Sequence, residues 1–285
     1  MPARRTRPPT ARLRRLGSEL RRLREGCQMS RDEVEQHTGI NGATLYRIET
    51  AQSCPQKRTL LALLNAYGVT DPQRAELVEM CRNAGQQGWL RPYHAELPEE
   101  YATYISFEAE ARSVRNYESL YVPGLLQTED YARAVIKGTL PTASQREVEH
   151  RVQARMERQA LLGKEDPLQL WAIMDEAAVR RQVGGREAMR AQVQRILAAA
   201  EEPNVTVQVI PFDKGAHPGM PGAFVHMDFP EPADPQLVYV DTLAGDLLRE
   251  SEADIGRYTL MFEHLRAVAL GPDDTARLLA TIADA

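Results

Sequence analysis

The sequence predicts two domains of different fold class, an all-α domain of five helices followed by an α+β domain. The chain has 285 residues, which is enough for two domains of ordinary size. Through the first 82 residues apolar side chains recur at helical spacing, whereas after residue 98 short β-branched runs alternate with helical segments. The two parts also carry net charges of opposite sign.

A helix start, a glycine stop and a second helix start follow one another closely after residue 29. Ser30 and Glu33 form a capping box for the first helix, and Gly39 marks its end. Asn41 can cap the second helix, whose apolar residues at three-residue spacing face the core. Two helices joined in this way form the unit that inserts a helix into the DNA major groove, although ordinary helix packing produces the same periodicity.

Further helices are predicted on both sides of this unit. Asp71-Pro72 begins the last of them, so that five helices fall within residues 13–82. The apolar residues at helical spacing are Leu13, Leu16, Leu20 and Leu23 before the unit, and Leu60, Leu63, Leu64 and Tyr67 after it.

The segment LRRLREGCQMSRDEVEQHTGINGATLYRIETAQSCP resembles the Xre and phage-repressor helix-turn-helix family. The resemblance covers about the first quarter of the chain, and it implies a sequence-specific DNA-binding transcriptional regulator. Two residues depart from the family pattern. Glu35 stands where a small alanine is usual, and Ala51 stands where a glycine usually follows the recognition helix. We expect the fold to tolerate both.

The second helix of the unit also departs from the family where it would read DNA. Gly42 and Ala43 stand where polar base-reading side chains are common, so Ala43 is left to touch a thymine methyl. Arg47 is the best candidate for a base contact, because a guanidinium can bind guanine O6 and N7 together; an ion pair with Glu49 is the alternative. We predict base reading by Asn41, Ala43 and Arg47, the last of which the resemblance places toward the groove, and phosphate contacts by Arg31, Thr44, Lys57 and Arg58.

A net positive charge is confined to the N-terminal part. Residues 1–82 carry 15 Lys and Arg against 9 Asp and Glu, a net charge of +6, whereas the remaining 203 residues carry 20 and 31, a net charge of −11. Binding to phosphates needs local positive charge, and a duplex would repel the acidic part. Residues 1–12 hold four arginines and no acid, so we expect a flexible arm that follows the DNA, with a solvated tail as the alternative.

The cysteines and histidines do not indicate a disulfide framework or a metal site. Cys27, Cys54 and Cys81 are widely spaced and form no CxxC pair, so we expect reduced, packed thiols. His217 and His226 are nine residues apart, which is poor ligand spacing, and we expect no metal or other cofactor. Since no apolar run suits secretion or a membrane span, we expect a cytoplasmic protein that joins the nucleoid when bound to DNA.

Glycines and prolines interrupt the helical periodicity in residues 83–98, which we interpret as a linker. Residues 99–285 are predicted to form an α+β domain around a mixed sheet. Its strands are predicted at LQLWAIMD, VTVQVIPF, AFVHMDF and LVYVD, and its helices from Pro98, from Thr128 and over residues 144–162, 186–200, 255–269 and 273–283.

Three segments of this second part, YVPGLLQTEDYARAVI, MDEAAVRRQVGG and PNVTVQVIPFDKGAHPGMPGAFVHMDF, are similar to the C-terminal domain that follows an Xre-type helix-turn-helix in many actinobacterial regulators. The similarity extends over most of residues 95–270. It implies an antitoxin-like regulatory domain controlled by a small partner protein encoded nearby.

Two regulatory functions remain open from the sequence. The first is a homodimeric regulator bound to an inverted-repeat DNA operator, since one short recognition helix reads too few bases for selectivity. The alternative is a regulator that responds to a small molecule bound in the second domain. The candidate partner or ligand residues are Pro123, Gly124, Phe212, His217 and Phe224, although ordinary turns and buried aromatics explain the same residues.

Catalysis is the least favoured function. Asp175-Glu176 and Glu201-Glu202 are adjacent carboxylates, but both pairs stand at predicted element ends, where acidic residues are commonly solvated. No nucleophile elbow or phosphate-binding glycine loop accompanies them, so we expect no enzyme.

Overall fold

The computed structural model describes residues 11–84, 99–230, 234–242 and 245–284. Their contacts form two compact units: one holds the first six helices, and the other holds the sheet and the remaining helices. The predicted arm lies outside the described residues except for its last two positions, and the predicted linker lies outside them from residue 85 onward. The fold class predicted from the sequence, an all-α part followed by an α+β part, is confirmed.

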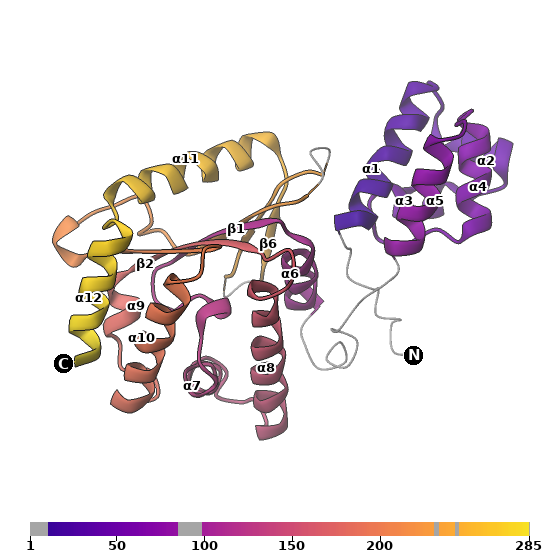
Figure 1. Cartoon of the computed structure of the whole chain (residues 1–285). Helices are drawn as coiled ribbons and strands as arrows, with labels where there is room; N and C mark the ends of the chain where they lie inside the picture. Colours follow the sequence, from indigo (N-terminus) through magenta and orange to yellow (C-terminus); the bar gives the residue numbers. More distant parts are fainter. Residues whose placement is uncertain (1–10, 85–98, 231–233, 243–244, 285) are drawn as a thin grey trace. The chain divides into compact units, whose positions relative to one another are not determined.

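The first unit is entirely helical (Figure 1). Its core is a continuous cluster in which Leu16, Leu20, Val34, Leu45 and Leu64 are fully buried. These residues come from four helices, so the apolar periodicity of the sequence does mark the faces that pack together. The helices are α1 (Ala11–Gly26), α2 (Arg31–Thr38), α3 (Gly42–Glu49), α4 (Lys57–Ala66), α5 (Gln73–Ala84) and α6 (Glu99–Glu110).

The second unit is built on a six-stranded mixed sheet, in the order β3-β2-β1-β4-β5-β6. β1, β2 and β3 are parallel, and β4, β5 and β6 each run antiparallel to the strand before them in that order. The strands are β1 (Ser113–Glu118), β2 (Gln169–Asp175), β3 (Val205–Ile210), β4 (Phe224–Asp228), β5 (Leu237–Val240) and β6 (Leu247–Arg249).

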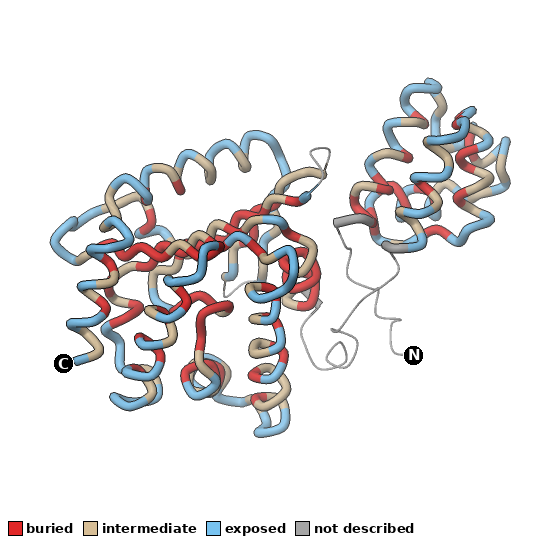
Figure 2. Tube along the Cα trace, viewed as in Figure 1, coloured by how far each residue is buried: buried red, intermediate tan, exposed pale blue. Residues whose placement is uncertain are grey.

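Helices cover both faces of this sheet (Figure 1). α11 packs on one face, where Phe262 and Leu265 meet Tyr117 and Phe224, and α7, α8 and α10 lie on the other. Burial is accordingly most complete on β3, β4 and β5 and one-sided on the helices, whereas the edge strand β6 is largely exposed (Figure 2). The helices are α7 (Glu129–Thr139), α8 (Gln145–Arg158), α9 (Glu176–Arg180), α10 (Arg186–Ala200), α11 (Glu252–Val268) and α12 (Pro272–Asp284), with 3-10 turns η1 (Gly124–Leu126), η2 (Gln159–Leu162) and η3 (Phe212–Lys214).

Two strands and one short helix were not predicted. β1 lies in the middle of the sheet, yet it reads SVRNYE, because polar Arg115 and Asn116 interrupt its apolar alternation. β6 and α9 have only three and five residues, too few for a periodic pattern. The four predicted strands correspond to β2, β3, β4 and β5, and the predicted helix over residues 186–200 coincides with α10.

Candidate nucleic-acid interface

The turn between α2 and α3 has the geometry that the sequence predicts. The backbone N–H of Glu33 donates to Ser30 Oγ at 3.2 Å, and the backbone N–H of Ser30 donates to Glu33 Oε2 at 2.8 Å. Gly39 ends α2 with a φ of +71°, which favours glycine. The Asn41 side chain accepts from the N–H of Ala43 at 2.9 Å and so caps α3.

The helix α3 has one buried face and one exposed face. Leu45 and Ile48 are buried in the helical core, as expected. Tyr46 has 46% of its surface exposed. The three candidate base-reading residues, Asn41, Ala43 and Arg47, are exposed, and so is the candidate phosphate-contacting Thr44. The exposed side of α3 therefore presents short side chains at its start and a guanidinium near its end.

Glu49 does not pair with Arg47, the alternative role considered for that arginine. Its buried carboxylate instead accepts from Arg24 Nε at 2.6 Å and lies 2.9 Å from Arg31 Nη2. Arg24 comes from α1 and Arg31 from α2, so one carboxylate of α3 joins three helices. A buried charge that loses its partner costs about 3–5 kcal/mol, which makes this network a structural element of the unit.

Arg31, a candidate phosphate contact, already has partners in the structure. Besides its ion pair with Glu49, its guanidinium lies 5.2 Å from the ring centre of Tyr46. The arginine and the ring stack as a cation–π pair, which holds the Tyr46 ring on the exposed side of α3. Sequence spacing does not indicate this pair, because the two residues lie on different helices.

Glu35, the departure from the family pattern in α2, contacts the start of α3. Its carboxylate accepts from the backbone N–H of Gly42 at 2.8 Å and from Asn41 Nδ2 at 3.4 Å. The first N–H groups of a helix lack partners within the helix, and a negative charge is favourable there. A longer side chain in place of alanine is thus accommodated by capping α3.

The other departure, Ala51, follows the end of α3. Its φ is +57°, a conformation that a side chain disfavours, and its N–H donates to Ile48 O at 3.0 Å. The N–H of Gln52 donates to Arg47 O at 2.8 Å, which completes a Schellman motif. The candidate phosphate contacts Lys57 and Arg58 follow in the first turn of α4 and are exposed.

His217, a candidate of the second unit, has partners for both ring nitrogens. Nε2 lies 3.1 Å from Asp175 Oδ2, and Nδ1 accepts from the N–H of Gly219 at 3.3 Å. The ring packs edge-on against Tyr117, with the centroids 6.2 Å apart. A Cβ on Gly219 would lie 2.3 Å from the Tyr117 ring, so only glycine fits at this position. These contacts account for His217 as part of the packing.

The other four candidates of the second unit do not form one site with His217. Phe224 is 98% buried in the core beneath α11, whereas Phe212 is 58% exposed in η3. Pro123 and Gly124 begin η1, where a Cβ on Gly124 would lie 3.6 Å from both terminal nitrogens of the buried Arg158. The sequence does not single out Arg158, which packs beside Gly124.

Two expectations about polar groups were wrong. Glu176 is buried rather than solvated. Its carboxylate accepts from the backbone N–H of Phe212 at 2.7 Å and pairs with Arg180. The neighbouring Asp175 caps α9. Cys27 and Cys54 are exposed rather than packed, since both lie beyond the ends of helices. Glu201-Glu202 is exposed, as expected.

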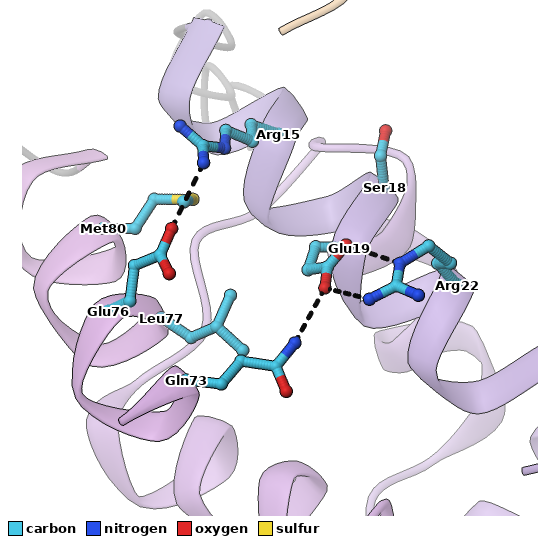
Figure 3. A pocket seen from close by; sticks show the side chains of 8 residues that line it. All are labelled: Arg15, Ser18, Glu19, Arg22, Gln73, Glu76, Leu77 and Met80. Carbon is cyan, nitrogen blue, oxygen red and sulfur yellow. Dashed lines mark hydrogen bonds and ion pairs between the residues drawn. The ribbon is translucent and has the colours of Figure 1, made fainter. Parts of the chain in front are cut away.

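A hollow lies between α1 and α5 (Figure 3). Its charges are matched internally: Arg22 Nη2 lies 2.6 Å from Glu19 Oε1, and Arg15 Nη2 lies 3.2 Å from Glu76 Oε1. The hydrogen bond from Arg22 lowers the pKa of the Glu19 carboxyl. This hollow lacks the net positive charge that phosphates need. Its lining residues are Arg15, Ser18, Glu19, Arg22, Gln73, Glu76, Leu77 and Met80.

Two parts of the chain match known protein families. Residues 101–281 match a domain of unknown function, DUF5753. The chain belongs to the DUF5753 family. In this DUF5753 protein, residues 15–77 also match a helix-turn-helix domain, which spans α1 to most of α5 and indicates a DNA-binding regulator. No curated protein and no solved structure matches the chain.

In the part of this DUF5753 protein that the structure describes, no group of three or more His, Cys, Asp or Glu is arranged to hold a metal ion. None of the described helices is both long and apolar enough to cross a membrane.

Proposed function

We propose that this chain is an Xre-type transcriptional regulator that binds duplex DNA by placing α3 in the major groove. The observation that carries the proposal is the exposure of Ala43, Arg47 and the N-cap residue Asn41 on α3, while the buried Leu45 and Ile48 hold the helix on the core. The basic balance of residues 1–82 supplies the electrostatic attraction to phosphates.

Arg47 is the residue whose removal tests this proposal. Footprinting on the DNA upstream of the chain's own gene first defines an operator. Arg47→Ala should then weaken operator binding by about 1–3 kcal/mol and relax selectivity at one base pair, because a bidentate guanine contact is lost. Fluorescence anisotropy with labelled duplexes measures both. An Arg47→Ala protein that melts like the parent and binds the operator unchanged would contradict the assignment.

Phosphate contacts are distinguished from base contacts by their salt dependence. Lys57 and Arg58 are exposed at the start of α4, where the N-cap residue Gln56 makes no side-chain cap. Lys57→Ala should weaken binding to all sequences alike and reduce the slope of log affinity against log salt by about one. A loss confined to the operator sequence would instead assign Lys57 to base reading. Arg31 and Thr44 are proposed as secondary phosphate contacts, with Arg31 restrained by Glu49.

We propose that the regulator binds an inverted repeat as a homodimer. Gly42 and Ala43 leave few base contacts on each recognition helix, and two half-sites supply the missing selectivity. Light scattering should give twice the monomer mass at binding concentrations, and the footprint should show two-fold symmetry. A monomer that protects an asymmetric site would contradict this proposal.

We propose further that a small partner protein, encoded nearby as in antitoxin-like actinobacterial regulators, controls the second unit. The sequence similarity of residues 95–270 and the net charge of −11 of residues 83–285 support a protein partner rather than a DNA contact. A partner shifts DNA occupancy only through different affinities for the two states, for which a coupling of about 1–3 kcal/mol is typical. Calorimetry with the product of the adjacent small gene tests this: absent binding, or binding that leaves operator affinity unchanged, favours the small-molecule alternative.

A further inference from the structure

Two of the three cysteines lie together in the helix-turn-helix domain although 27 positions separate them. The Sγ atoms of Cys54 and Cys81 are 3.8 Å apart. Cys54 belongs to the loop between α3 and α4, and Cys81 belongs to α5. Sequence spacing alone did not indicate this pair, because it is made by the packing of α5 beside that loop.

The two thiols differ in their surroundings. Cys54 is exposed, whereas Cys81 is partly buried and packs against the helical core. The Cys81 thiol donates to the carbonyl oxygen of Pro55 at 3.4 Å. Its hydrogen bond with Cys54 and its burial raise the pKa of Cys81 well above the usual range. An oxidant from solution therefore meets Cys54 first, while Cys81 is held as a thiol beside it.

The loop that carries Cys54 is tied directly to the candidate base-reading residue. Backbone N–H groups of Gln52 and Ser53 both donate to the carbonyl oxygen of Arg47, at 2.8 and 3.1 Å. Ala51, which lies between α3 and these residues, is 97% buried. A displacement of Cys54 is thus transmitted through two residues to the last turn of α3.

We propose that Cys54 and Cys81 form a thiol-modification site that hydroperoxides oxidise to an intrachain disulfide, and that this bond lowers DNA affinity. The Cys54 thiolate attacks one peroxide oxygen, which becomes a sulfenic acid while the other oxygen leaves as hydroxide or alcohol. The Cys81 sulfur then displaces the sulfenic oxygen as water, and the S–S bond forms. Two thiols lose two electrons, and the peroxide gains them.

Bond formation requires movement at the DNA-facing loop. The sulfurs must approach from 3.8 Å to the roughly 2.05 Å of a disulfide. Because α5 is anchored by its buried Leu77, the loop moves more than the helix does. The shift pulls residues 52–54 and the Arg47 carbonyl toward α5, so the oxidised domain presents the end of α3 in a different position.

The experiment treats the full-length protein with hydrogen peroxide, maps its peptides by mass spectrometry and measures operator affinity before and after. We expect a loss of two hydrogens, a peptide cross-linked between Cys54 and Cys81, and an operator Kd raised about tenfold, within the usual range of allosteric coupling. Dithiothreitol should reverse both changes. Cys54→Ser and Cys81→Ser should each abolish the cross-link and the peroxide sensitivity of DNA binding.

Cys27→Ser is the matched control, because Cys27 is also exposed in the same unit. This variant should keep the cross-link and the affinity loss. Stable sulfenic or sulfinic acid on Cys54 without the cross-link, or a disulfide that leaves operator affinity unchanged, would overturn the proposal. Its DNA readout rests on the proposed function: if the reduced protein binds no DNA, that function fails, whereas the peptide map still decides whether the disulfide exists.

Discussion

Two helix ends in the first unit are formed by residues other than glycine at positive φ. Gln28 has a φ of +57° after α1, and Ala51 has the same value after α3. In both cases backbone hydrogen bonds complete a Schellman motif; after α1 these are Gln28 N to Glu25 O at 2.9 Å and Met29 N to Arg24 O at 3.1 Å. The motif therefore holds each residue in a conformation that costs a side chain about 1–2 kcal/mol.

Gln28→Gly should stabilise the first unit by about 0.5–1 kcal/mol. The substitution removes the strain at positive φ, and the greater freedom of glycine in the unfolded chain offsets part of the gain. Because Gln28 is exposed, no packing is lost. Ala51→Gly is the comparison: it relieves the same strain but removes a buried methyl group, so its gain should be smaller. Urea unfolding measures both, and an equal gain would contradict the packing argument.

Glu118 in β1 makes stability depend on pH. Burial and then the nearby Asp241 carboxyl raise the pKa of Glu118 to about 8, against contributions from Arg155 and Asn116. The folded protein therefore favours the neutral carboxyl of Glu118. Between the unfolded pKa of about 4.5 and the folded pKa of about 8, the unfolded chain ionises this group and the folded chain does not, which lowers the free energy of unfolding. The contribution of Glu118 to stability is fully present below pH 4.5, and it is lost as the pH rises toward 8.

Glu118→Gln should therefore stabilise the second unit more at pH 8 than at pH 5, because glutamine does not ionise. Denaturant unfolding at several pH values gives the difference in free energy of unfolding between variant and parent. Glu201→Gln is the control, since Glu201 is exposed and should show little change across the same range. A difference that is constant with pH would show that Glu118 ionises normally in the folded chain.

At the scale of elements, the close approach of α1 and α3 depends on Gly17. A Cβ at this position would lie 2.7 Å from Ile48 O and 2.9 Å from Glu49 O, both backbone atoms that cannot rotate away. Glu49 joins the same helices through Arg24, so any separation of α1 from α3 also stretches a buried ion pair.

Gly17→Ala should destabilise the first unit by about 1–3 kcal/mol, as overpacking does in a close-packed core. Gly26→Ala in the same helix has nothing within 4 Å of the added Cβ and should instead stabilise by about 0.5–1 kcal/mol through helix propensity. Thermal unfolding followed by circular dichroism compares the two. Stabilisation by both would mean that the helices separate without cost.

The sequence predicted elements whose residues interact locally and missed those that depend on distant partners. The capping box, Gly39 and the leucine spacing identify α1 to α5, since each feature lies within a few residues. β1 was missed because polar Arg115 and Asn116 interrupt its apolar alternation, so that only its pairing with β2 and β4, more than 50 residues away, reveals the strand. The Glu49 network and the thiol pair were missed because their members are distant in the sequence.

At the scale of the whole molecule, residues 1–84 and the rest of the chain carry net charges of opposite sign, and this asymmetry should govern non-specific DNA binding. Residues 1–84 have a net charge of +6, against −5 for the full chain. The core of α1 to α5 is formed within residues 13–81, which supplies a fragment of residues 1–84 with its own hydrophobic cluster. In the full chain, the acidic residues beyond this core lower the local attraction to phosphates.

The fragment of residues 1–84 should therefore bind random-sequence duplex more tightly than the full chain at low salt. The difference should shrink as ionic strength rises, because the Debye length falls from about 30 Å at 0.01 M to about 8 Å at 0.15 M and screens the distant acids. Anisotropy titrations across this range measure it, after a cooperative thermal transition has shown that the fragment folds. The fragment with Arg47→Ala should keep the advantage, since the acidic residues and not base reading produce it. Equal affinities of fragment and full chain at low salt would mean that the acidic unit does not influence the DNA-binding surface.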